Sequence, residues 1–96
     1  MANPEDLAIL KQGVEQWNKW RWKHDHVWPD LGAADLSGAD LWKANFRGSN
    51  LSRADLRGAN LWNVNLHSAN LSWANLFETE LTEADLSSVD LCAAVA

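Results

Sequence analysis

Few residues of this chain have the types and spacing that catalysis or metal binding requires. His24 and His26 flank Asp25, but a zinc site needs a third and usually a fourth ligand. No serine lies in a nucleophile motif, and Cys92, the single cysteine, is interpreted as a small hydrophobic residue. Asp and Asn recur along the chain, yet no glycine-rich calcium loop accompanies them. The sequence therefore predicts a protein that is not an enzyme and that holds no metal or cofactor.

Tryptophan is the residue type that points to another kind of function. The chain has seven Trp and no Tyr among its 96 residues. Exposed Trp side chains are costly unless something covers them, and Trp is enriched at the centres of binding interfaces. These residues favour binding over catalysis, provided that the fold holds some of them at the surface.

The chain repeats every five residues from residue 30 onward. Thirteen successive positions carry Leu or, once, Phe46, and Asp or Asn precedes twelve of them, with Glu80 the exception. Ala stands two residues before eight of them. Five residues advance an α-helix by about 140°, so the leucines would share no helical face, and an odd period alternates them across a strand. We therefore expect short extended stretches separated by bends, wound into a solenoid with Leu, Phe46 and the small residues inside.

These repeats carry a family resemblance. Segments such as 34–38 (ADLSG) and 59–63 (ANLWN) resemble the A(D/N)LXX signature of pentapeptide-repeat proteins, over about 68 of the 96 residues. The resemblance implies an all-β solenoid, a right-handed quadrilateral β-helix with four repeats per coil and thus about three coils. It also implies that the corner residues after each Leu point outward. Residues 9–21 resemble the leader segments of cyanobacterial members.

The first 28 residues have a different pattern, and we divide the chain into a cap (1–28) and a solenoid (29–96). Asn3 is a good N-cap, Pro4 suits the first helical turn, and apolar residues then recur at helical spacing. These features predict one helix over residues 4–22. The helix is interpreted as a cover for the open strand edge of the first coil. The alternative is an amphipathic helix that docks on a partner or a membrane surface, although its balanced charges give little attraction to anionic lipid.

Four repeats per coil place residues 20 apart on the same face. The four expected columns after the central Leu are Trp42, Trp62 and Thr82; Arg47, His67 and Ser87; Ser52, Ser72 and Cys92; and Ser37, Arg57 and Phe77. Trp73 and Phe77 are expected to form a second aromatic cluster. The candidate partner-binding residues are therefore Trp42, Trp62, Trp73 and Phe77. Either the tryptophans of the cap or a protein partner would cover the Trp42–Trp62 pair.

The C-terminal end of the solenoid is the second candidate surface. No helix is predicted after the last repeat, so its backbone groups would stay unpaired beside an apolar patch of Val89, Leu91, Cys92 and Val95. We expect this end to dock on its own copy, giving a homodimer through the C-terminal coil, or on a protein partner.

Charge and composition narrow the function further. The net charge of −5 disfavours direct nucleic-acid binding. The chain has no apolar run long enough for a membrane span and no basic signal peptide, and the lone cysteine suggests the cytoplasm. We expect a non-catalytic protein–protein interaction or scaffold module, a component of a larger assembly. The alternative is a DNA-mimicking inhibitor of a topoisomerase such as gyrase, although Arg47, Arg53 and Arg57 interrupt the acidic surface that it needs.

Overall fold

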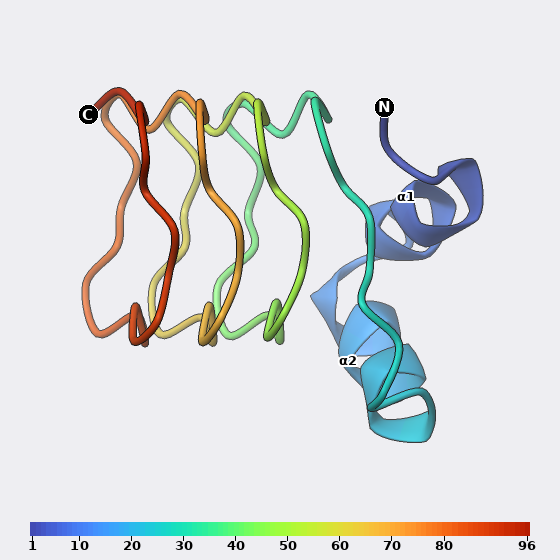
Figure 1. Cartoon of the computed structure of the whole chain (residues 1–96). Helices are drawn as coiled ribbons and strands as arrows, with labels where there is room; N and C mark the ends of the chain where they lie inside the picture. Colours follow the sequence, from blue (N-terminus) through green and yellow to red (C-terminus); the bar gives the residue numbers. More distant parts are fainter.

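The chain begins with two helices, where the sequence pattern predicts one over residues 4–22. The computed structural model describes residues 1–96 and contains α1 (Pro4–Lys11) and α2 (Val14–Lys23). The side chain of Asn3 caps α1 by accepting from the backbone N–H of Glu5 at 2.8 Å. Gly13 separates the helices with a φ of 112°, a conformation that glycine adopts readily and that ends a right-handed helix. The single-helix prediction is therefore wrong at Gly13, and the resulting bend lets both helices lie across one end of the solenoid (Figure 1).

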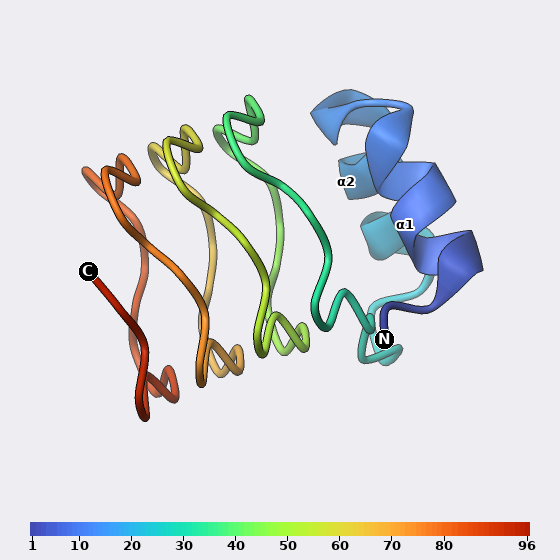
Figure 2. The ribbon, with the colours of Figure 1, turned by 90° about the horizontal axis from the view of Figure 1, so that it is seen from above.

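Residues 30–95 wind into coils of 20 residues. Parallel bridges join every fifth residue to the residue 20 positions later, beginning with Asp30 to Asn50 and ending with Asn75 to Val95. Four bridging positions, five residues apart, occur in every coil, so the coil has four sides. Figure 2 shows the coils stacked one beside another, with the helices at the N-terminal end.

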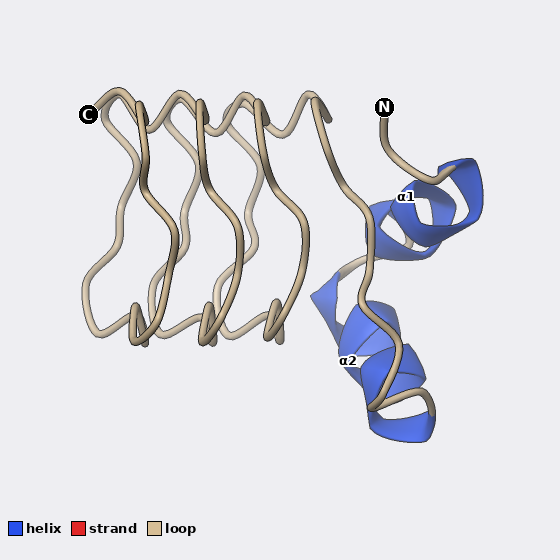
Figure 3. Cartoon of the chain, viewed as in Figure 1, coloured by secondary structure: helices blue, strands red, loops and turns tan.

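No side of the coil contains a regular strand, and in this respect the expected all-β architecture needs correction. The β-structure consists of isolated single-residue bridges, and the solenoid is drawn without strands in Figure 3. The reason is a turn after every central Leu. In the first of them the N–H of Ala34 donates to the carbonyl of Leu31 at 3.1 Å, and Ala33 has a φ of 59°. A positive φ at the third residue is the mark of a type II turn, which leaves only about three extended residues per side.

The residue before the central Leu stabilises that turn in every repeat but the one of Asp40. The Oδ1 atom of Asn60, for example, accepts the N–H of Trp62 at 3.1 Å. Glu80, the one departure from Asp or Asn, reaches the N–H of Thr82 with its longer side chain at 2.8 Å. Such Asx-type bonds explain why short polar side chains recur at this position.

The interior holds the residues that the five-residue period predicts. Leu residues from Leu31 to Leu76 are buried, together with the small residues that precede them by two positions, except the half-buried Ala39. Phe46 is fully buried, as predicted, and its ring lies 5.7 Å from that of Trp17 in α2. Burial ends in the last coil, where Leu86 and Leu91 are exposed.

Candidate functional site

The cap takes the place of a preceding coil at two sides of the first coil. The carboxylate of Asp6 accepts the N–H of Asp30 at 3.0 Å. The amide of Asn18 accepts the N–H of Asn45 at 2.8 Å, and the indole N–H of Trp17 donates to the carbonyl of the same residue at 2.7 Å. In later coils, backbone groups of the neighbouring coil make these bonds. Side chains of the helices thus satisfy part of the open edge, which supports the interpretation of this segment as a cover.

Arg21 is the most buried cation of the chain and fixes the cap to the solenoid. Its side chain is only 3% exposed. One of its terminal nitrogens donates to the carbonyl of Val27 at 2.8 Å, and the other donates to the carbonyl of Arg47 at 2.9 Å. Burial lowers the pKa of the guanidinium, and the nearby carboxylate of Asp25 partly offsets that effect. The sequence pattern counted Arg21 only among the balanced charges of the helix, although its position four residues after Trp17 places both on one helical face.

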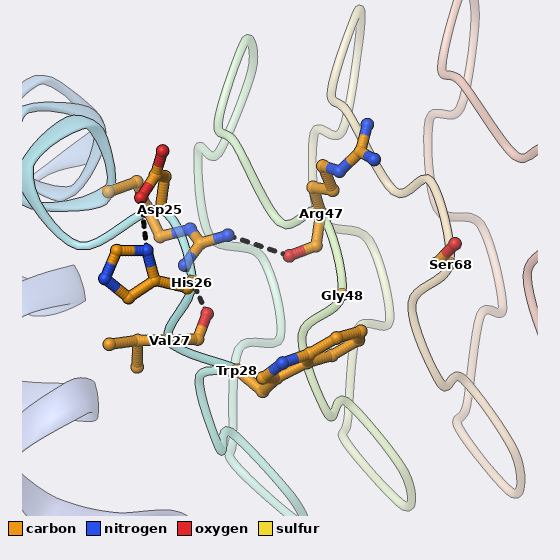
Figure 4. A pocket seen from close by; sticks show the side chains of 8 residues that line it. Asp25, His26, Val27, Trp28, Arg47, Gly48 and Ser68 are labelled. Atoms are coloured by element: carbon orange, nitrogen blue, oxygen red, sulfur yellow. Dashed lines mark hydrogen bonds and ion pairs between the residues drawn. The ribbon is translucent and has the colours of Figure 1, made fainter.

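A cavity of about 270 Å³ opens beside this junction. Figure 4 shows it, with the ring of Trp28 lying over Gly48. A Cβ atom at Gly48 would meet that ring at 2.9 Å, and the φ of Gly48 is 66°. Non-glycine residues such as Ala33 adopt the same positive φ in other turns, so it is the close approach of the Trp28 ring that excludes a Cβ atom at Gly48.

Trp42 and Trp62 lie on one face in adjacent coils, as the 20-residue spacing predicts. Their ring centroids are 6.0 Å apart, and the ammonium of Lys43 lies 4.9 Å from the Trp42 ring and 5.9 Å from the Trp62 ring. Trp42 is 43% exposed and Trp62 is half-buried. The register of the coil and the cation–π contacts together hold two neighbouring indole rings in place, tilted by 43° to each other.

The tryptophans of the cap do not cover this pair. The ring of Trp17 contacts those of Trp20 and Phe46, and Trp28 lies over Gly48. Trp22 is exposed on α2. No ring contact joins a tryptophan of the N-terminal segment to the pair, so of the two covers that the sequence left open a protein partner is the one that stays a prediction.

Trp73 and Phe77, the other two candidates, do not form the aromatic cluster that we expected. Both are exposed, and no ring contact joins them. The guanidinium of Arg53 lies over the Trp73 ring at 5.4 Å, because these residues are 20 apart and occupy the same column. Trp73 also has a φ of 62°, because it is the third residue of its turn.

The C-terminal coil leaves its edge open. Leu91 and Val95 are exposed, Val89 is half-buried, and Cys92 is an exposed free thiol. Cys92 therefore lies at the surface, as its place in an outward-facing corner column predicts, and its interpretation as a small hydrophobic residue stays a prediction. The N–H groups of the central residues Leu81, Leu86 and Leu91 have no intramolecular acceptor, whereas those of earlier coils bond to the next coil.

Hydrogen bonds stabilise the charged form of several surface carboxylates and so lower their pKa values. The hydroxyl and the N–H of Ser87 donate to Asp85 and lower its pKa, and Thr82 does the same for Glu80. Ser37 lowers the pKa of Asp35 in the same way. The guanidinium of Arg57 donates to Asp55 at 2.7 Å, which lowers the pKa of Asp55 and raises that of Arg57.

The histidines at the end of α2 do not form a metal site with their neighbours. His26 contacts Asp25 at 2.8 Å, while the Nδ1 atom of His24 faces the carbonyl of Trp20 at 2.9 Å. No group of three or more His, Cys, Asp or Glu side chains could hold a metal ion.

Neither helix has the length and apolar composition needed to cross a membrane.

A comparison of the sequence with models of protein families finds one kind of repeat in this chain. The model of the family described as pentapeptide repeats matches in eight copies, over residues 34–72 and 54–92. No curated protein matches the sequence.

Solved structures with similar repeats come from a plant and from cyanobacteria. A pentapeptide repeat protein of the Arabidopsis thaliana thylakoid lumen is 33% identical, with a TM-score of 0.55 over 68% of this chain and 48% of its own. Rfr23 of Cyanothece 51142 is 37% identical, with a TM-score of 0.46 over 69% of this chain and 48% of its own. HetL of Nostoc sp. PCC 7120, involved in heterocyst differentiation regulation, is 38% identical, with a TM-score of 0.44 over 70% of this chain and 34% of its own.

The chain spans about half the length, or less, of these three proteins. The matched repeats cover more than half of the chain and coincide with the coils described above. The chain therefore belongs to the pentapeptide-repeat family.

Proposed function

We propose that the chain is a non-catalytic protein–protein interaction module, in which the solenoid presents side chains to a protein partner within a larger assembly. The observation that carries this proposal is the Trp42–Trp62 pair. Two adjacent indole rings stand at the surface with Lys43 across both, and the cap does not use them. An aromatic pair fixed by a rigid backbone loses little conformational entropy on binding, which is the property of an interface hot spot.

The proposal is tested by affinity capture from the source cells with the wild-type chain and a Trp42→Ala/Trp62→Ala variant. Trp22→Ala is the matched control, because Trp22 is an equally large exposed aromatic residue on α2, outside the solenoid. Partners identified by mass spectrometry should be recovered with the wild type and the control and lost with the double variant. Recovery of the same partners by all three folded proteins would contradict the role of this face.

The alternative function, a DNA-mimicking inhibitor of a topoisomerase such as gyrase, requires a continuous acidic surface. The second coil instead carries Arg53 over Trp73 and Arg57 paired with Asp55. A gyrase supercoiling assay separates the two functions, since a DNA mimic inhibits the enzyme and an adaptor does not.

Two further properties belong to the same proposal. We infer the right-handed, quadrilateral form of β-helix for the coils, supported by the four-sided bridging pattern and the family membership. We also propose the cytoplasm as the compartment, on the basis of the single free thiol of Cys92. The plant protein compared above comes from the thylakoid lumen, so fractionation of the source cells is the direct test of the compartment.

A further inference from the structure

One repeat of the solenoid lacks the hydrogen bond between side chain and backbone that closes its turn, and this repeat carries Trp42. In every other repeat the side chain before the central residue accepts the N–H two positions later, as Asn60 does from Trp62 at 3.1 Å. The exposed carboxylate of Asp40 forms no hydrogen bond and no ion pair, and the N–H of Trp42 has no acceptor within the chain. A carboxylate without a partner therefore stands in the same repeat as one ring of the aromatic pair.

The corner of the solenoid that carries this pair is acidic. The three repeats stacked there, 20 residues apart, carry three carboxylates and one ammonium, those of Asp40, Glu80 and Glu83 and of Lys43. All four side chains are exposed. None of the three carboxylates has an ion-pair partner, and Glu80 accepts only from the uncharged Thr82. Since opposite charges across an interface favour association, this surface suits a cationic partner.

The aromatic pair already holds a cation. The ammonium of Lys43 lies 4.9 Å from the centroid of the Trp42 ring and 5.9 Å from that of the Trp62 ring. Both distances are within the reach of about 6 Å at which a ring face attracts a cation. The two ring faces thus suit a positive charge, and the exposed side chain of Lys43 fills that position in the absence of a partner.

Elsewhere in the same solenoid, arginine makes both kinds of contact that this surface offers. Arg53 lies over the ring of Trp73 at 5.4 Å. Arg57 donates through two nitrogens to the carboxylate of Asp55, at 2.9 and 2.7 Å. A guanidinium is planar and carries five donors, so it can stack on a ring and pair with a carboxylate at two points, whereas an ammonium is a point charge. Arginine is therefore the residue that best combines the rings with the carboxylate of Asp40.

From these observations we propose that the face of Trp42 and Trp62 binds an arginine-bearing segment of a protein partner. The guanidinium stacks on the indole rings in place of the Lys43 ammonium and pairs with the carboxylate of Asp40. This inference rests on the proposed interaction function and names the chemistry of the partner at the same surface. It also makes Lys43 an intramolecular competitor of that partner.

The probe is a synthetic peptide of about ten residues with two arginines, separated by one residue, among Gly, Ser and Leu. In an extended chain these arginines are about 6.6 Å apart on one face, close to the 6.0 Å between the two ring centroids. One control peptide carries citrulline, the neutral isostere of arginine, at both positions, and another carries Glu. Binding to the full chain is followed by NMR from the N–H signals of Trp42 and Trp62. The Arg peptide should shift these signals and bind more weakly at high salt, and neither control peptide should bind.

Two variants with opposite effects separate this mechanism from simple apolar contact. Asp40→Asn should weaken binding of the Arg peptide about fivefold, the upper range for an exposed ion pair. Lys43→Ala should strengthen it about threefold, because the competing cation is removed. The matched controls are Asp35→Asn and Lys11→Ala, which make the same charge changes in the preceding repeat and in α1. Both controls should change binding by less than about twofold, since salt screens distant charges.

Three results would overturn the proposal: equal binding of the Arg and citrulline peptides, equal affinities of Asp40→Asn and Asp35→Asn, or no gain from Lys43→Ala over Lys11→Ala. Preference for the Glu peptide would overturn it as well, and would identify an acidic partner held by Lys43.

The same variants in the affinity capture separate this inference from the proposed function. Partners that require Trp42 and Trp62 but are captured equally by the wild type and by Asp40→Asn would refute the arginine contact alone. Recovery of the same partners without either Trp residue would refute the proposed function itself.

Discussion

Removing the same leucine side chain from two consecutive coils should have very different effects on stability. Leu71 and Leu91 occupy the same column, 20 residues apart, but Leu71 is 0% exposed and Leu91 is 46% exposed. Truncation to Ala removes about three carbon groups, worth roughly 0.8 kcal/mol each when fully buried. At Leu71 a cavity term is added, so Leu71→Ala should lower the free energy of unfolding by about 3 kcal/mol. At Leu91 only about half of the transfer term applies and no enclosed cavity forms, which gives about 1 kcal/mol.

The assay is thermal and urea unfolding of the two variants beside the wild type, followed by circular dichroism. A difference of about 2 kcal/mol corresponds to a gap of roughly 10 °C in Tm for a chain of this size. Leu91→Ala also serves as the control, because both variants remove the central Leu of one repeat and differ only in how deeply that Leu is buried. Equal Tm values for the two variants would refute the reasoning that burial between coils, rather than membership of the repeat, sets the contribution of each Leu.

The remaining predictions concern the cap, a turn and the pH dependence. Arg21→Met should destabilise the chain by about 3 kcal/mol, because it breaks a buried charged hydrogen-bond network, and unchanged urea unfolding would contradict that role. Gly48→Ala should destabilise the chain by about 1 kcal/mol more than Gly58→Ala, since both have a positive φ but only the first would place a Cβ against Trp28; Trp28→Ala in the same chain should remove the difference. Stability should also decline in acid. Four carboxyl groups have a lowered pKa in the folded chain, namely Asp35, Asp55, Glu80 and Asp85. Their contribution to the free energy of unfolding is complete above the ordinary pKa values of 3.8 for Asp and 4.5 for Glu, and it is lost as the pH falls through the lower pKa values of the folded chain. The Tm measured from pH 6 to pH 2 should therefore drop below about pH 4. A flat profile would show that these hydrogen bonds contribute nothing to stability.

The solenoid, its interior and its register can all be predicted from the repeat in the sequence. A five-residue period with Leu at its centre excludes a straight helix or strand, and the burial of Phe46 and Leu71 and the alignment of Trp42 with Trp62 follow from counting residues. These features depend on local turns and on neighbours at a fixed separation of 20, both of which are present in the repeat itself.

The contacts between the cap and the coils, and the surroundings of several aromatic side chains, depend on the folded chain and could not be predicted from the repeat. The contacts of Asn18 with Asn45 and of Arg21 with Arg47 join residues 26 or 27 positions apart, and no repeat or period encodes them. The break at Gly13 brings those side chains into reach by changing the direction of the second helix. A buried charged side chain such as Arg21 needs hydrogen-bond acceptors, and here these are backbone carbonyl groups that have no partner in the neighbouring coil. Which carbonyl groups lack such a partner depends on how the whole chain has folded.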